Sequence, residues 1–113
     1  MVQLIARLTA TIANGASLSD ALTLNGAQVA VIEMPAAWTA AVITFQSSVD
    51  GTNYFNLFGD DGNEIYVEAD ASRRIHVNLD ALSQHKYIKL RSGTATTAIA
   101  QGAARTIYVE VWS

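Results

Sequence analysis

The chain has 113 residues and a formal net charge of -3 at pH 7, and 50% of its residues are hydrophobic while only 15% are charged. This length corresponds to one domain spanning residues 1–113, and the apolar content excludes a disordered chain. We expect no membrane-spanning segment and no secretory signal. The acidic balance disfavours a nucleic-acid partner, and the lack of cysteine excludes a disulfide framework. The low charge predicts that neighbouring subunits cover part of the surface.

Alternating apolar and polar residues predict β-strands along the whole chain. Apolar side chains recur at every second position in five segments, which are 4–12, 41–45, 75–79, 88–91 and 107–112. A further apolar run over 29–34 is ended by Pro35. Four turn dipeptides lie between the strands, namely Asn14-Gly15, Asn25-Gly26, Asp50-Gly51 and Asp61-Gly62. Short strands joined by such turns predict an all-β antiparallel sandwich or barrel.

Two later segments depart from this alternation. The sequence of Asp80–Gln84 predicts at most a single helical turn between two strands. Thr94–Ala104 consists of Thr, Ala, Gly and Gln with Ile99 as its one large apolar residue. This composition predicts a long loop or arm before the last strand, and small side chains make the arm available for close contacts with neighbouring subunits.

Residues with metal-binding or catalytic chemistry are few. The turn Gly59–Glu64 carries carboxylates and an amide that calcium could bind, but a solvated hairpin turn is the favoured interpretation. His76, Asp80 and His85 could supply ligands to zinc, although isolated polar positions are again favoured. The Gly-x-Ser-x-Gly elbow of serine hydrolases and a glycine-rich phosphate loop are both absent. We therefore expect no enzymatic activity, no metal and no cofactor.

Aromatic residues form two groups that are candidates for contacts with a partner. Tyr54, Phe55 and Phe58 follow the Asp50-Gly51 turn, where they could stack on a sugar or dock a partner. The favoured interpretation is that Phe55, with Leu57, fills the core while Tyr54 and Phe58 cover its edge. Two further aromatics, Tyr108 and Trp112, lie on the face of the last strand opposite its three aliphatic residues. That position predicts either a second buried layer or a subunit contact.

Three segments carry a resemblance to a known group of proteins. They are Trp38–Tyr54, with its Ser-Ser-Val-Asp-Gly-Thr-Asn-Tyr ending, then Lys86–Gly93 and Thr106–Val111. Their order resembles that of small virion proteins of tailed bacteriophages. It is also similar to the discoidin-type, galactose-binding-like jelly roll, and together the two resemblances cover most of residues 4 to 112.

The resemblance implies an eight- or nine-stranded β-sandwich that serves as a structural component of a phage particle. The leading hypothesis is a capsid decoration, or cement, protein that forms a homotrimer on the capsid exterior and clamps the major capsid protein. The alternatives are a carbohydrate-binding module of a spike or tail, in which Tyr54 and Phe58 contact a host glycan, and a tail structural component. Under the leading hypothesis Tyr54, Phe58, Tyr108 and Trp112 are the candidate interface residues.

Overall fold

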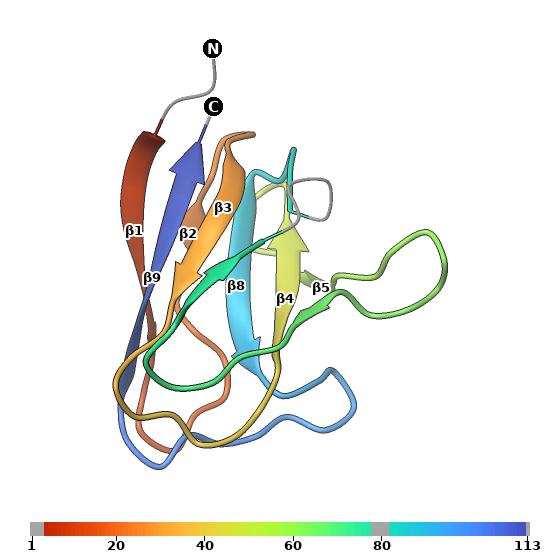
Figure 1. The fold of residues 1–113 in the computed structure, drawn as a ribbon. Coiled ribbons are helices and arrows are strands. Elements are labelled where there is room, and N and C mark those ends of the chain that lie inside the picture. The colour runs from red at the N-terminus through yellow and green to blue at the C-terminus, as the bar shows by residue number, and fades with distance from the viewer. Residues whose placement is uncertain (1–3, 78–81, 113) are drawn as a thin grey trace.

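Two antiparallel sheets packed face to face make up the fold (Figure 1). The computed structural model describes residues 4–77 and 82–112, and these residues contain no helix. Its nine strands are β1 Leu4–Ile12, β2 Leu22–Thr23, β3 Gln28–Glu33, β4 Ile43–Ser48, β5 Phe55–Asn56, β6 Tyr66–Val67, β7 Arg74–His76, β8 Tyr87–Ser92 and β9 Arg105–Trp112. The predicted all-β sandwich of eight or nine strands is therefore confirmed. None of the described segments is a helix that could cross a bilayer.

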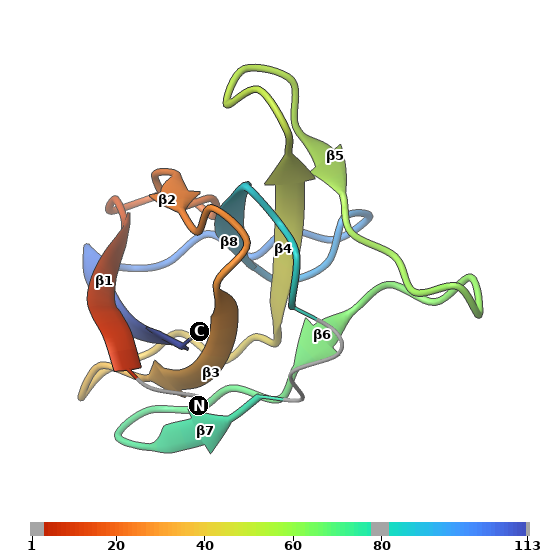
Figure 2. The ribbon, with the colours of Figure 1, turned by 90° about the horizontal axis from the view of Figure 1, so that it is seen from above.

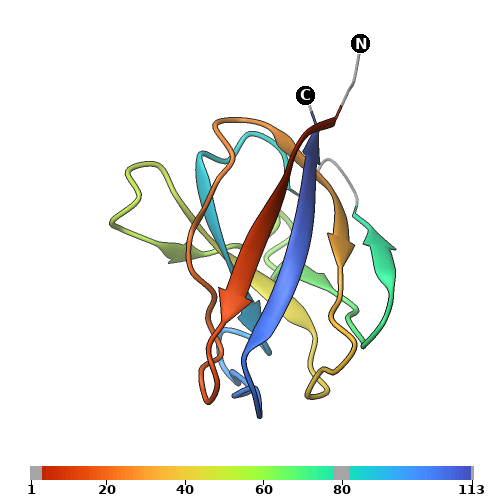
Figure 3. The ribbon, with the colours of Figure 1, turned by 90° about the vertical axis from the view of Figure 1, so that its left-hand side faces the viewer.

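The two sheets differ in the length of their strands. The first, sheet A, has the order β1-β9-β3-β7, and its long central strand β9 pairs with β1 over Leu4 to Ile12. The second, sheet B, has the order β2-β8-β4-β5, and β6 also pairs with β4. Figure 3 shows β1 and β9 side by side at one margin of the sandwich. At the opposite margin of the sandwich, sheet B ends in β5 and β6, which have two residues each.

The core lies between the sheets and is built from the inward half of each alternating strand. Ile107, Val109 and Val111 of β9 are buried, whereas the residues between them are half-buried on the outer face. Strand β4 places Phe45 in the centre of the core with no exposed surface. The period-2 pattern thus correctly predicts the buried face of β9, whereas β4 and β8 also bury Thr44 and Arg91 on the face predicted to be wetter.

The turn dipeptides lie where the sequence predicts them, between strands. All four of their glycines have a positive φ, at Gly15, Gly26, Gly51 and Gly62. A fifth positive-φ glycine, Gly93, is packed against backbone, since a Cβ there would lie 2.5 Å from the carbonyl oxygen of Thr97. Gly93 lets the chain leave β8 and fold back tightly on itself.

The segment over residues 94–104 is a loop that is anchored to the sandwich. Gln101 is fully buried, and its side-chain Nε2 donates to the carbonyl oxygen of Thr39 and to Ser92 Oγ. The backbone N–H of Gln101 also donates to Ala16. The prediction of a long loop is correct, and the buried Gln101 side chain anchors the loop to the sandwich while residues 96–98 and 102–104 stay exposed. The helical turn predicted over Asp80–Gln84 lies partly outside the described residues.

Candidate functional site

On one side of β4, sheet B continues only in the short strands β5 and β6. Strand β5 pairs with β4 only through Gln46–Asn56 and Ser47–Phe55, and β6 pairs with β4 near its start. Between them the hairpin of residues 57–65 leaves the sandwich, and so does the turn of residues 49–54 (Figure 2). Two short edge strands and two projecting loops therefore form this side of the molecule.

Four large apolar side chains are exposed on these loops and short strands. Val49 is 82% exposed, Phe55 73%, Tyr66 58% and Phe58 52%. We call these four residues the apolar edge. The prediction that Phe55 fills the core is wrong, because β5 is an edge strand and the phenyl ring of Phe55 lies beyond the area that sheet A covers. The second residue predicted for the core, Leu57, is half-buried and packs against it.

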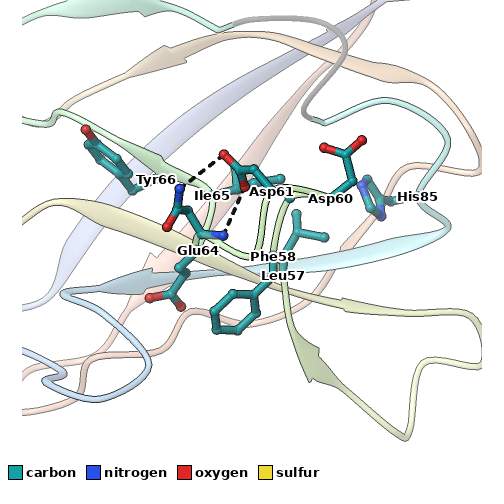
Figure 4. A pocket seen from close by; sticks show the side chains of 10 residues that line it. Leu57, Phe58, Asp60, Asp61, Glu64, Ile65, Tyr66 and His85 are labelled. Atoms are coloured by element: carbon teal, nitrogen blue, oxygen red, sulfur yellow. Dashed lines mark hydrogen bonds between the residues drawn. The ribbon is translucent and has the colours of Figure 1, made fainter.

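An open depression of about 850 Å³ lies along the apolar edge (Figure 4). Phe58 and Tyr66 supply aromatic rings to its lining, and Leu57 and Ile65 supply aliphatic side chains. The polar groups come from the hairpin and from the segment before β8, and they are Asp60, Asp61, Asn63, Glu64 and His85. Rings beside hydrogen-bonding groups can contact either a protein surface or a polar ligand with a flat apolar face.

Two of the three carboxylates of the hairpin, those of Asp61 and Glu64, are engaged by groups of the protein itself. Asp61 Oδ1 accepts a hydrogen bond from the backbone N–H of Asn63 at 2.9 Å, and Asp61 Oδ2 accepts one from its side-chain amide at 3.2 Å. These bonds lower the pKa of Asp61 below its usual range. Glu64 Oε2 pairs with Arg91 Nη2 at 2.7 Å. The turn Asp60–Glu64 is therefore a hydrogen-bonded hairpin turn, and its carboxylates do not converge on a common centre.

A buried arginine positions the hairpin that carries the site. Arg91 of β8 is only 6% exposed, and its Nε donates to Thr44 Oγ1 at 3.0 Å. Its Nη1 donates to Asn56 Oδ1 of β5 at 2.8 Å, and its Nη2 binds Glu64 of the hairpin. Glu64 in turn accepts from the backbone N–H of Ala95. One guanidinium thus ties β4, β5, the hairpin and the loop after β8 together.

The turn before β5 is also organised by a carboxylate. Asp50 Oδ1 accepts hydrogen bonds from the backbone N–H groups of Asn53 and Thr52, each at 2.8 Å. Those bonds, with further ones from the side chains of Asn53 and Ser48, hold the pKa of Asp50 well below its usual range. The bonded turn places Val49 in the solvent beside Phe55, and both line a second depression of about 480 Å³.

The predicted interface residues do not form one surface. Tyr54 and Phe58 flank sheet B, whereas Tyr108 and Trp112 lie on the outer face of β9 in sheet A. The Tyr54 ring is half-buried beneath Lys89, whose Nζ lies 4.4 Å from the ring centre. Burial, with the nearby Tyr87 and Asp50, raises the pKa of the Tyr54 hydroxyl. Of the four candidates, Phe58 alone belongs to the apolar edge.

The outer face of sheet A is covered by an ion-pair network. Arg7 lies 3.7 Å over the Tyr108 ring and pairs with Glu33, which also accepts from Arg74 Nη1 at 2.6 Å. Arg74 Nη2 then reaches Glu110 at 2.8 Å. The hydrogen bond that Arg74 donates to Glu33 lowers the pKa of Glu33, and the bonds that Arg74 donates to Glu110 and Glu33 raise the pKa of Arg74. Tyr108 therefore packs within its own subunit.

The histidines considered as zinc ligands lie beside different sheets. His76 is exposed on β7 of sheet A. His85 Nδ1 shares a hydrogen bond of 2.8 Å with Ser47 Oγ of β4 in sheet B. The third candidate, Asp80, lies outside the described residues. Within the described ranges, no three histidine or acidic side chains are grouped as a metal would require.

Sequence reasoning missed two of the four residues of the apolar edge, Val49 and Tyr66, and it considered Phe55 for a partner contact but favoured the core. The strands β5 and β6 have only two residues each, so no alternation could assign their side chains to a face. One signal was available, since Val49 adjoins the Asp50-Gly51 turn and lies beyond the alternating segment 41–45. The chain matches no protein-family model and no curated protein.

Proposed function

We propose that the protein is a structural subunit that docks onto the surface of another protein through the apolar edge. The observation that carries this proposal is the exposure of Val49, Phe55, Phe58 and Tyr66 along the margin of sheet B formed by β5 and β6, where Val49 with Phe55 and Phe58 with Tyr66 line two separate depressions. Apolar patches rimmed by polar residues mark sites of protein association. Aromatic side chains dominate the binding energy of such interfaces, because their burial removes large areas from water.

The proposed partner is the major capsid protein of a tailed phage, and the proposed location is the exterior of the capsid. This part of the proposal depends on the resemblance carried by 38–54, 86–93 and 106–111. A cement role agrees with the low charge of the chain, because few charged groups need to lose water when the subunit is covered. Repetition of the contact over a capsid lattice gives high avidity from a small surface on each subunit.

A homotrimer remains part of this proposal, but two of the features expected to join the copies make contacts within their own subunit. Tyr108 is covered by Arg7, and the loop over 94–104 is anchored through Gln101. Neither feature is free to exchange between subunits. A three-fold contact would therefore use exposed groups, and the mass of the purified protein in solution tests it directly.

The experiment that tests the docking proposal is sedimentation of the purified protein with expanded capsids from the same phage. We expect the wild-type protein to sediment with the capsids, and Phe55→Ser with Phe58→Ser to abolish this. His76→Ala is the matched control, because it removes an exposed ring from the other sheet. Equal sedimentation of the double variant and the wild type would contradict the proposal.

A carbohydrate-binding function is the second candidate, and the open depression favours it. Phe58 and Tyr66 present rings that can stack on a sugar, while Asp60, Asn63 and His85 line the same depression and can exchange hydrogen bonds with hydroxyl groups. A glycan array tests this function. The carbohydrate-binding function would be supported if the wild type bound a defined glycan, if Tyr66→Ala bound that glycan more weakly, and if the protein did not sediment with capsids.

A further inference from the structure

Strand β1 is the longest edge strand in the described part of the chain. It has nine residues, pairs with β9 on one side, and lies at the outer margin of the molecule (Figures 1 and 3). The other edge strands have two or three residues, and β7 also carries Arg74. Natural proteins shorten or charge their edge strands because an open edge pairs readily with another strand. The length of β1 therefore needs an explanation.

The hydrogen bonds of Thr11 show which groups face the open side of β1. Its N–H donates to Asp20 Oδ1 at 2.9 Å, and its carbonyl oxygen accepts from the N–H of Asp20 at 3.3 Å, away from β9. Residues of an antiparallel strand turn their backbone groups alternately to the two sides. The N–H and C=O groups of Thr9 and Arg7 therefore face the open edge as well. They have no hydrogen-bond partner among the described residues.

The side chains around this edge leave room for another strand. Arg7 extends across β9 to Tyr108 and Glu33, so its side chain does not cover the open backbone groups of β1. On the inner side of β1, Ala6 and Leu8 are half-buried. They line an open depression of about 350 Å³, whose other walls include Leu24, Ala27 and Val111. The edge thus combines free backbone groups with an apolar floor.

We propose that β1 pairs in antiparallel fashion with β1 of a second copy of this chain, about a two-fold axis at Leu8. Arg7 then forms a hydrogen-bonded pair with the partner's Thr9, and Thr9 forms one with the partner's Arg7, so that all the free backbone groups are satisfied. Leu8 faces the partner's Leu8 over the two apolar depressions. No like charges lie opposite each other, and the surface is self-complementary, as a two-fold contact requires.

This contact joins the two four-stranded copies of sheet A into one continuous sheet. It uses the margin opposite the apolar edge, so it goes beyond the proposed docking function and does not depend on it. A two-fold contact joins two units whether each unit is one chain or a trimer. The mass of the assembly should therefore double with rising protein concentration.

The test is sedimentation velocity of the wild type and of three variants of Thr9 over a range of concentrations. Thr9→Pro should abolish the doubling, because it removes an N–H that faces the open edge while leaving the bonds to β9 intact. Thr9→Lys places a like charge opposite the partner's Arg7 twice and should weaken association about tenfold. Thr9→Glu, the matched control, places opposite charges there and should retain association.

Amide hydrogen exchange measured by NMR gives an independent readout that does not depend on the variants folding. The N–H groups of Arg7 and Thr9 should exchange rapidly at low concentration and slowly at high concentration, whereas that of Leu8, which faces β9, should stay protected throughout. The proposal would be overturned if the mass of the wild type never doubled. It would also be overturned if Thr9→Pro and Thr9→Lys doubled in mass as readily as the wild type.

Discussion

The pair between Arg91 and Glu64 should be the most sensitive electrostatic contact in the described part of the protein. The side chains are 7% and 15% exposed, and their atoms approach to 2.7 Å. Glu64→Gln keeps an acceptor near Arg91 but removes the negative charge, which leaves a buried guanidinium without compensation. Removing one partner of a buried pair costs about 3–5 kcal/mol. Because glutamine retains one acceptor, we expect about 3 kcal/mol.

Such a loss is large for a protein of this size. With roughly 4 °C of melting temperature per kcal/mol, the midpoint of thermal unfolding should fall by about 12 °C. Urea unfolding followed by circular dichroism measures the free energy directly, and the slope of the transition should not change. The matched control is Glu33→Gln, which removes a carboxylate paired with two arginines on the exposed face of sheet A. Its effect should be a small fraction of that at Glu64.

A double variant separates the charge from the shape of the site. Replacing both partners by apolar side chains, Arg91→Met with Glu64→Leu, removes the uncompensated charge and should recover more than half of the lost stability. If Glu64→Gln costs less than about 1 kcal/mol, the pair is as solvated as a surface ion pair. The account of how the hairpin is held would then be wrong.

Three further predictions concern the backbone and the turns. Gly93→Ala should destabilise the protein far more than Gly15→Ala in urea unfolding, because both glycines have a positive φ but only Gly93 is packed against backbone. Gln101→Ala should cost about 2–3 kcal/mol in the same assay, because the buried groups that bond its amide lose their partner. The depressed pKa of Asp50 means that its bonds stabilise the fold above about pH 4 and that this contribution is lost as the pH falls further. Asp50→Asn should therefore lower the melting temperature at neutral pH and reduce its dependence on acid.

The parts of the fold that the sequence predicts are those governed by local pattern. The alternation in 107–112 correctly assigns Ile107, Val109 and Val111 to the core, and the Asn-Gly and Asp-Gly pairs mark the turns. Each of these features depends on a few neighbouring residues, and the sequence displays them directly. Pro35 likewise ends the third strand where it is expected.

The parts that the sequence does not predict depend on contacts between distant residues. Arg91 and Glu64 are 27 positions apart, and nothing in either segment indicates that they meet. The role of Gln101 is similar, since its amide donates a hydrogen bond to Thr39 from a segment that the sequence predicts only as a long loop or arm. Phe55 is a large apolar residue of the kind that usually lies in the core. It is exposed because β5 has only two residues and lies at the edge of its sheet. The candidate site consists largely of such residues.

Under the proposed function, the apolar edge is the surface that contacts the capsid. Hydrogen–deuterium exchange of the protein bound to capsids, compared with the free protein, tests this claim most directly. We predict that protection increases in the segments around Phe55 and Phe58, while the outer face of sheet A around Tyr108 is unchanged. Protection confined to sheet A, or none at residues 49–66 in protein that remains bound, would contradict the account.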